Sequence, residues 1–144
     1  MQFLQLRGLT SLPTERIGRQ FRSEDVRAVL PVQLVARTTE ALLVATRSAL
    51  AIVVPAKVPT ARWKIHWASL ETVRISDGTD PWTEWFVDEY QLFVDVGRVR
   101  FEAHLAGERG RRVLRDFVAA VWTQPARARA PEDRLKQSGM IVGT

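Results

Sequence analysis

The segment from Tyr90 to Trp122 constrains the fold most strongly, because its hydrophobic period changes once along its length. Two segments with a period of two meet at Gly97, and a segment with a period of 3.6 begins at Glu108. The first period is typical of half-buried strands, and the second is typical of an amphipathic helix. The sequence therefore predicts two strands followed by a helix that ends before Pro125.

The predicted hairpin in this segment can be tested for consistency by treating Val96-Gly97 as its two-residue turn. One face then collects apolar side chains, and the other collects an ion pair and an arginine–aromatic contact, as a half-buried antiparallel pair requires. The predicted pairs are Asp95 with Arg98, Val94 with Val99, Phe93 with Arg100, Leu92 with Phe101, and Gln91 with Glu102.

Residues 41–54 predict a second hairpin, which turns at Arg47-Ser48. The pairing places Ala45 opposite Leu50, Leu43 opposite Ile52, and Leu42 opposite Val53. Both faces of this hairpin are apolar, which a sheet with a single dry face does not need. We therefore expect the N-terminal segment, the C-terminal helix or another copy of the chain to cover its outer side.

The remaining segments extend this pattern to about seven short strands. Their ranges are 30–37, 41–46, 49–54, 62–67, 70–76, 90–95 and 98–104. Within 70–76 the apolar residues are spaced by three and then by two, which predicts a bulge. Residues 1–29 are expected to form an N-terminal extension with a short helix over 14–21, and residues 123–144 a flexible tail without a periodic apolar face.

The composition is that of an ordinary soluble domain. The chain has 144 residues, of which 46% are hydrophobic and 26% are charged, and it has no cysteine. Disulfides and cysteine-based metal sites are therefore excluded, and the composition suits a reducing cytosol. The first twenty residues lack a signal-peptide pattern, and no apolar run reaches the length of about 18 residues that a membrane span needs. We expect a cytoplasmic protein that reaches a membrane, if at all, from its surface.

The formal charge of +5 is concentrated at the two ends of the chain. Residues 1–39 carry six arginines against three acids, and residues 105–144 carry eight basic residues against four acids. Residues 40–104 are mildly acidic, with seven basic residues against nine acids. A nucleic-acid-binding domain more often carries its basic residues on the folded unit itself, so specific nucleic-acid binding is not expected.

The order of seven short strands and one amphipathic helix resembles the pleckstrin-homology superfold, in particular the small bacterial PH-like and GRAM-type domains. The segments that carry the resemblance are ALLVATRSALAIVV, WKIHWASLETVRIS and the unit 90–122, and the similarity spans residues 30–122. The resemblance implies an α+β, mainly β fold: a bent antiparallel barrel of about seven strands, closed at one end by the C-terminal helix.

Such domains are similar in acting as binding modules without chemistry, which direct proteins to lipid headgroups or to other proteins. The resemblance implies that function lies on the loops or the rim of the barrel. Phosphoinositide-binding members carry several basic residues at the first hairpin, where this chain has only Arg37 before Thr38-Thr39-Glu40. Specific phosphoinositide recognition is therefore not expected.

The predicted loop 77–89 contains the strongest candidate for a partner-binding site. Trp82, Trp85 and Phe86 are three large aromatic residues in a segment that has five acids and no basic residue. Exposed aromatics of this kind are typical anchors of protein interfaces. The acids would repel an anionic membrane or a nucleic acid, so a protein partner or a second copy of the chain fits better. The alternative is that the aromatics fold back over the barrel as a small satellite core.

A second candidate is the basic loop around Lys57, Arg62 and Lys64. These side chains could meet an anionic membrane surface, where each contributes roughly 1 kcal/mol. The alternative is a loop that is merely solvated. The helix also carries a basic face, formed by Arg109, Arg111, Arg112 and Arg115, and such faces are usually solvated.

No residue pattern indicates an enzyme. His66 and His104 fall on the polar faces of predicted strands and lie in no catalytic motif, and we expect neither a metal nor a cofactor. A small-ligand site at the barrel mouth would rest on Trp63 and Trp67, whose alternation with Lys64 is that of an ordinary core strand. The sequence therefore favours a non-enzymatic domain that makes protein–protein contacts or self-associates, with membrane binding as the alternative.

Overall fold

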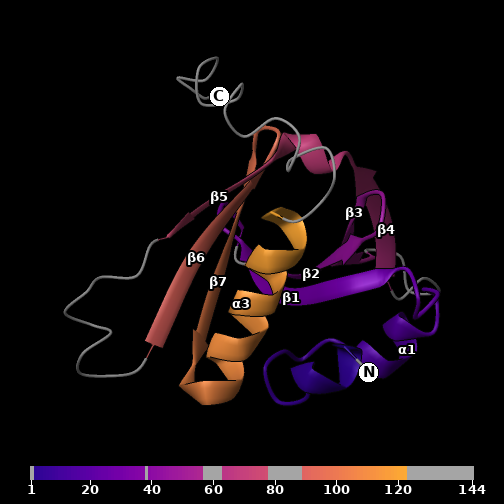
Figure 1. Cartoon of the computed structure of the whole chain (residues 1–144), viewed down its shortest axis with the longest axis horizontal. Coiled ribbons are helices and arrows are strands. Elements are labelled where there is room, and N and C mark those ends of the chain that lie inside the picture. Colours follow the sequence, from indigo (N-terminus) through magenta and orange to yellow (C-terminus); the bar gives the residue numbers. More distant parts are fainter. Residues whose placement is uncertain (1, 38, 57–62, 78–88, 123–144) are drawn as a thin grey trace.

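In the computed structural model shown in Figure 1, the chain forms one antiparallel sheet with helical segments packed against it. The structure describes residues 2–37, 39–56, 63–77 and 89–122. Within these ranges the sheet has seven strands: β1 (Val26–Leu34), β2 (Thr39–Thr46), β3 (Leu50–Pro55), β4 (Trp63–Ala68), β5 (Val73–Asp77), β6 (Glu89–Val96) and β7 (Val99–Ala106). The helical segments are η1 (Gln2–Leu6), α1 (Thr14–Gly18), η2 (Leu70–Thr72) and α3 (Gly107–Trp122). The fold is α+β and mainly β, as predicted.

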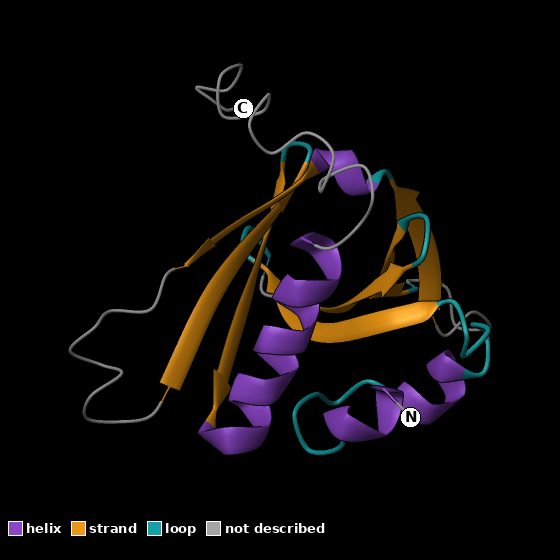
Figure 2. Ribbon diagram, viewed as in Figure 1, coloured by secondary structure: helices purple, strands orange, loops and turns teal. Residues whose placement is uncertain are grey.

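The strands follow the order β4-β3-β2-β1-β7-β6-β5. Figure 2 shows that the sheet is bent, with β5, β6 and β7 on one side of α3 and the other strands on its opposite side. Among the described residues no ladder joins β4 to β5, so the sheet is not closed into a barrel. The predicted barrel is therefore corrected to a bent, open sheet whose edges are β4 and β5.

The two edge strands are joined by a short 3₁₀ turn and not by a two-residue hairpin loop. In this turn the Ser69 hydroxyl accepts a hydrogen bond from the Glu71 N–H at 3.2 Å, and the Thr72 hydroxyl donates to the Ser69 carbonyl at 2.7 Å. The turn spaces Leu70 and Val73 by three residues, and both are buried. The bulge predicted here is wrong. Among the described residues, the strands on the two sides of this turn, β4 and β5, do not pair with each other.

The predicted hairpin at 41–54 is confirmed. The β2–β3 ladder pairs Ala45 with Leu50, Leu43 with Ile52, and Leu42 with Val53. The Thr46 hydroxyl closes the turn, because it donates to the Ala49 carbonyl at 2.8 Å and accepts from the Ala49 N–H at 3.1 Å. Local hydrogen bonds and apolar pairing therefore agree on one register.

The N-terminal segment covers one face of this hairpin. Phe3, Leu6 and Ile17 are buried in the same hydrophobic core as the sheet. Phe21 meets Trp67 of β4 edge-on, with ring centroids 6.1 Å apart. Through the ladders Trp67 aligns with Ala51, Val44 and Val29, so these residues share the covered face.

Helix α3 covers the opposite face. It contacts β1, β2, β6 and β7, and Gly110 lies directly against Leu105 of β7. Leu105 shares its face with Phe101, which pairs with Leu34 of β1. Leu34 and Val29 differ by an odd number of residues along β1 and so lie on opposite faces. One chain therefore supplies both of the covers that the apolar hairpin requires.

The β6–β7 hairpin turns one residue later than predicted. Its central residues are Gly97 and Arg98, and Gly97 has φ +61°, which suits glycine at the first position of a hairpin turn. Asp95 now pairs with Arg100 instead of Arg98, and Phe93 with Glu102. Each partner changes by two positions, so every side chain keeps its predicted face. The ion pair to Asp95 is made by Arg100, at 2.7 and 2.9 Å, and not by Arg98 as predicted. The predicted contact of Arg100 with the Phe93 ring is present, with the guanidinium carbon 4.9 Å from the ring centroid.

Strand β1 begins at Val26, four residues earlier than predicted, and contains Pro31 in its interior. Pro31 pairs with Leu42 of β2, whereas β7 pairs with β1 only at Gln33 and Leu34. The stretch of β1 around Pro31 therefore has one ladder neighbour, which is the situation in which a strand tolerates a missing N–H.

Helix α3 follows the predicted amphipathic pattern. Val113, Leu114, Phe117 and Val121 are buried as predicted, whereas Trp122 is 47% exposed. The helix approaches β7 closely at Gly110, where an added Cβ would lie 2.8 Å from the Leu105 Cβ.

We expect Gly110→Ala to lower the free energy of unfolding. Overpacking against Leu105 costs about 1–3 kcal/mol, which exceeds the gain in helix propensity of about 1 kcal/mol over most of that range. Urea unfolding followed by circular dichroism measures the change. Arg112→Ala, at an exposed position on the same helix, is the control and should change stability by less than about 0.5 kcal/mol. A Gly110→Ala protein that is more stable than the wild type would contradict the close packing of α3 on β7.

Candidate functional site

Strand β4 is the most unusual surface of the sheet, because it is an edge strand with exposed side chains on both faces. It pairs with β3 over its whole length, from Trp63 opposite Pro55 to Ala68 opposite Leu50. In the described part of the chain no strand pairs with its other side. An edge of this kind presents unpaired backbone N–H and C=O groups to another chain.

The side chains of β4 add an apolar anchor to this edge. Trp67 is 60% exposed, although tryptophan is usually well buried. Lys64 and His66 are exposed on the opposite face, and Trp63 and Ile65 are half-buried beside Trp67. The edge therefore combines backbone hydrogen-bonding groups, a large apolar side chain and positive charge within one short strand.

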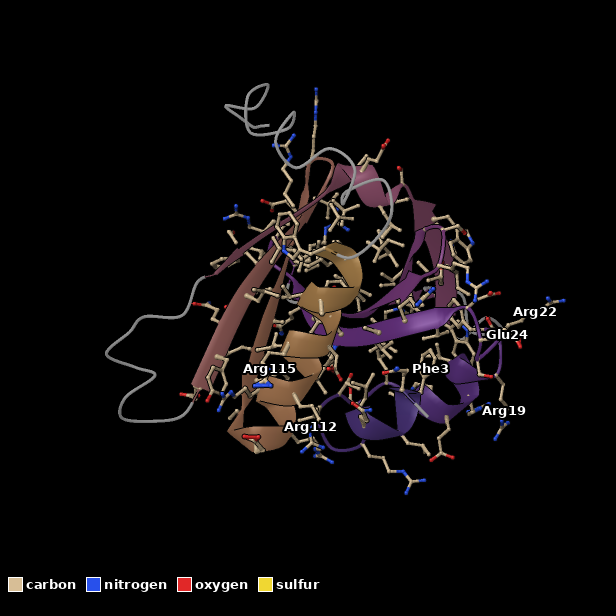
Figure 3. The ribbon with its side chains drawn as sticks, in the orientation of Figure 1. Phe3, Arg19, Arg22, Glu24, Arg112 and Arg115 are labelled. Atoms are coloured by element: carbon tan, nitrogen blue, oxygen red, sulfur yellow. The ribbon has the colours of Figure 1, made fainter. Side chains whose placement is uncertain are left out.

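The N-terminal segment packs against the face of β4 that carries Trp63 and Trp67. Phe3 is buried, and its ring stacks on Phe21 with centroids 5.8 Å apart. Phe21 in turn contacts Trp67, and the Arg16 guanidinium lies 6.0 Å from the Trp63 ring. Figure 3 shows Phe3 between the N-terminal segment and the sheet. Trp67 is thus exposed but supported by a row of aromatic rings that begins in the core.

An apolar groove in the N-terminal segment continues this surface. It has a volume of about 380 Å³, and Phe3, Leu4, Phe21 and Val26 contribute its apolar lining. Leu4 is 44% exposed. Phe21 lines the groove and also touches Trp67, so the groove and the β4 edge are adjacent. The exposed apolar area is therefore larger than Trp67 alone.

Charged residues surround this area. Arg16, Arg19 and Arg22 are exposed, and Figure 3 shows the side chains of Arg19, Arg22 and Glu24 extending outward at this end of the molecule. Glu15 bonds to Arg7, and this hydrogen bond and charge lower the pKa of Glu15. The rim is therefore polar and the centre apolar, an arrangement that protein interfaces share.

Most of the residues that the sequence singled out are not placed by the structure. Trp82, Trp85 and Phe86 lie outside the described residues, as do Lys57 and Arg62. Lys64 is described, and it is exposed on β4. Of these six residues, Lys64 is therefore the one that the described part of the chain places, and it lies on β4 with Trp63 and Trp67, the two candidates for a small-ligand site.

Sequence reasoning missed Trp67. Its alternation with Lys64 and His66 predicted an ordinary core strand, in which Trp67 would be buried. Alternation reports which residues share a face, but not whether the strand has a neighbour on both sides. The sequence signal that could have found this site is the two tryptophans in a strand that also carries Lys64, because lysine is common on edge strands.

A second hollow, of about 210 Å³, lies on the polar face of β1 and β7 and includes Glu40, Glu102 and His104. Each of these polar groups already has a partner. Glu102 accepts a hydrogen bond from Gln91, and His104 lies 3.4 Å from Glu89. These contacts hold neighbouring strands together, which gives the hollow a structural role.

The basic face of α3 is exposed as predicted. Exposed positions are occupied by Arg109, Arg111, Arg112 and Arg115, and Figure 3 labels Arg112 and Arg115 on α3. Arg111 lies 3.9 Å from Glu108, an exposed contact of little energetic weight.

In the described part of the chain no helix is long and apolar enough to cross a membrane.

Glu40 of β2 attaches the N-terminal segment to the sheet. Its carboxylate accepts hydrogen bonds from the Thr10 hydroxyl at 2.8 Å, from the Ser11 N–H at 3.1 Å and from the Ser11 hydroxyl. The bonds from Ser11, with a smaller effect from Thr10, lower the pKa of Glu40 from its ordinary value of 4.5. The charged form of Glu40 therefore helps to hold the segment that supports Trp67.

We expect Glu40→Gln to lower the free energy of unfolding at pH 7 by on the order of 1 kcal/mol, because charged hydrogen bonds are lost. The lowered pKa means that the folded protein binds fewer protons at this site. The stabilisation that the Glu40 carboxylate contributes is therefore present above pH 4.5, and it is lost as the pH falls through the lowered pKa that Glu40 has in the folded protein. Urea unfolding between about pH 5 and 3 should show a shallower decline for the variant than for the wild type. Glu24→Gln, at an exposed position, should keep the wild-type decline, and an equally steep decline in Glu40→Gln would contradict this role.

No model of a known protein family matches this chain, and no curated protein matches it in sequence.

Proposed function

We propose that this protein is a non-enzymatic, PH-like interaction domain that binds another protein through the β4 edge. The observation that carries the proposal is that Trp67 is 60% exposed on a strand that, among the residues described, lies at an edge of the sheet. An extended segment of a partner can add to such an edge, with backbone hydrogen bonds giving affinity and side-chain contacts giving specificity. The partner is either a different protein or a second copy of this chain.

The PH-like assignment is supported by the strand order and by the helix at the end of the chain. A continuous antiparallel sheet bends around α3, which follows the last strand directly. The bent sheet with a C-terminal helix is the arrangement that the resemblance implies. The open edge between β4 and β5 departs from a closed barrel, and it is at this departure that the proposed contact lies.

Trp67 is expected to contribute most of the binding energy at this edge. Tryptophan buries up to about 250 Å² in an interface, so covering its exposed part is worth about 2–4 kcal/mol. The ring is already held against Phe21, which reduces the side-chain entropy lost on binding. A supported, exposed tryptophan with a polar rim is a typical energetic hot spot.

The aromatic, acidic segment 77–89 remains the second proposed contact, through Trp82, Trp85 and Phe86. It connects β5 to β6, and β5 is the other free edge of the sheet. Contacts at the two edges can be separated by mutating each one alone.

We expect Trp67→Ala to weaken binding to the protein partner by about 2 kcal/mol, or about 30-fold, because the main apolar anchor is removed. Quantitative affinity purification of the native chain, followed by binding titrations with each enriched protein, measures the change. Trp122→Ala is the matched control, since Trp122 is also half-exposed but lies on α3. A Trp82→Ala/Trp85→Ala variant reports on the second contact. If every bound protein binds Trp67→Ala as tightly as the wild type, the β4 edge is not the binding surface.

The alternative function is the binding of an anionic membrane surface, and the presence of an exposed lysine, Lys64, and an exposed tryptophan, Trp67, on the same strand favours it. Tryptophan prefers the membrane–water interface, and basic side chains are attracted to anionic lipid. Lys57 and Arg62 are the proposed companions of Lys64. This function would use the same end of the sheet as the protein contact.

For this alternative we expect the protein to float with anionic phosphatidylserine vesicles at low salt, and flotation to fall as salt screens the charges. Charge reversal by Lys57→Glu, Arg62→Glu and Lys64→Glu together should abolish flotation. Neutral phosphatidylcholine vesicles and the variant Arg112→Glu, on the face of α3, are the controls. No flotation with anionic vesicles at low salt would end the membrane hypothesis.

A further inference from the structure

The first five residues of β4 read the same in both directions by side-chain class. From Trp63 to Trp67 they are Trp-Lys-Ile-His-Trp, that is, aromatic, basic, aliphatic, basic, aromatic. Antiparallel pairing of two identical strands sets one strand against its own reversed sequence. A strand with this symmetry is therefore complementary to itself, which a two-fold interface requires.

We propose that the partner at this edge is a second copy of the chain, and that β4 pairs antiparallel with β4 of that copy, centred on Ile65. This inference rests on the proposed function and names its partner. The two sheets then join into one continuous sheet across a two-fold axis perpendicular to its plane. Trp63 of each copy lies opposite Trp67 of the other, Lys64 lies opposite His66, and Ile65 lies opposite its own counterpart.

The two-fold axis limits the registers that are available. The axis leaves each side chain on the same face of the joined sheet, and residues that pair directly also share a face. A pairing centred on a peptide bond would oppose two neighbouring residues, which lie on opposite faces, so the centre has to be a residue. A centre at Lys64 would set two lysines directly opposite each other, which is unfavourable. A centre at His66 would separate the tryptophans and pair Lys64 with Ala68. Only the centre at Ile65 makes two aromatic pairs, which are among the most favourable cross-strand contacts.

Both faces of β4 are accessible to such a neighbour. Lys64 and His66 are exposed on one face, and Trp67 is 60% exposed on the other. Phe21 and Arg16 contact the tryptophans from the N-terminal segment, and Trp67 is 60% exposed with these contacts in place. The copies can therefore approach without a change in the fold.

The other edge strand lacks this symmetry. β5 reads Val-Arg-Ile-Ser-Asp from Val73 to Asp77. Self-pairing centred on Ile75 would set Val73 opposite Asp77 and Arg74 opposite Ser76, so an apolar residue would meet an acid. An arbitrary extended peptide would need no palindrome at either edge. The palindrome at β4 therefore favours a second copy over an unrelated peptide.

Cysteine cross-linking tests the register, because the natural chain contains no cysteine. We expect Ile65→Cys to form a disulfide-linked dimer on mild oxidation, since directly opposed residues lie about 4.5–5.5 Å apart. Lys64→Cys and His66→Cys are the matched controls, because each is about 8 Å from its own counterpart in this register, too far for a disulfide. Preferential cross-linking of His66→Cys would overturn the register.

A pair of charge variants at exposed His66 tests the same contact without cross-linking. His66→Glu sets a carboxylate opposite Lys64 of the partner, twice in each dimer, and should tighten the dimer about two- to thirty-fold. His66→Lys sets two like charges opposite each other and should weaken it by a similar factor. Sedimentation velocity at a series of concentrations measures both dissociation constants. Equal effects of the two substitutions would contradict the pairing of positions 64 and 66.

The outcomes also separate this inference from the proposed function. Self-pairing is overturned if the wild-type chain stays monomeric up to about 1 mM and the Ile65→Cys variant forms no disulfide-linked dimer. If Trp67→Ala still weakens binding to another protein in that case, the proposed function stands and the partner is different. If a β4 dimer forms and Trp67→Ala leaves its dissociation constant unchanged, the tryptophan is not the anchor.

Discussion

The fold depends on one constraint: the β2–β3 hairpin is apolar on both faces and needs a cover on each. The N-terminal segment covers the face that carries Val44, and α3 covers the face that carries Leu43. The two covers come from opposite ends of the chain, so the hydrophobic core forms only when both ends pack on the sheet. This intrachain covering accounts for an apolar pattern that would otherwise suggest an interface on the face of the hairpin.

Because both faces of the hairpin are covered within the chain, the surface that remains for a partner is the edge of the sheet. The sheet bends around α3 without closing, and within the described ranges β4 has a ladder partner on one side only. Trp67 lies on this strand with Phe21 and Phe3 behind it, and Glu40 ties the N-terminal segment to β2. Support from the core and exposure at the edge together make β4 the surface on which the proposed contact depends.

Much of the fold could be predicted from local sequence patterns. The β2–β3 register followed from the apolar pairs around Arg47-Ser48, and the helical face followed from the spacing of Val113, Phe117 and Val121. The predicted β6–β7 register is wrong because it places Gly97 at the second central position of the turn, whereas Gly97, with its positive φ, occupies the first. The predicted faces of these side chains are nevertheless correct, because each cross-strand partner changes by two residues, which is an even number.

The sequence by itself determined which side chains share a face, since the alternation along each strand is a local property of the backbone. It could not determine whether β4 has a neighbour on its second side, because that depends on how the sheet bends around α3 and on the 3₁₀ turn at Leu70. The burial of Trp67 therefore could not be predicted: its face was correct, but its exposure is decided by strand order. The palindrome from Trp63 to Trp67 was present in the sequence from the start, and only the tertiary structure, by leaving β4 at an edge, gives it a consequence.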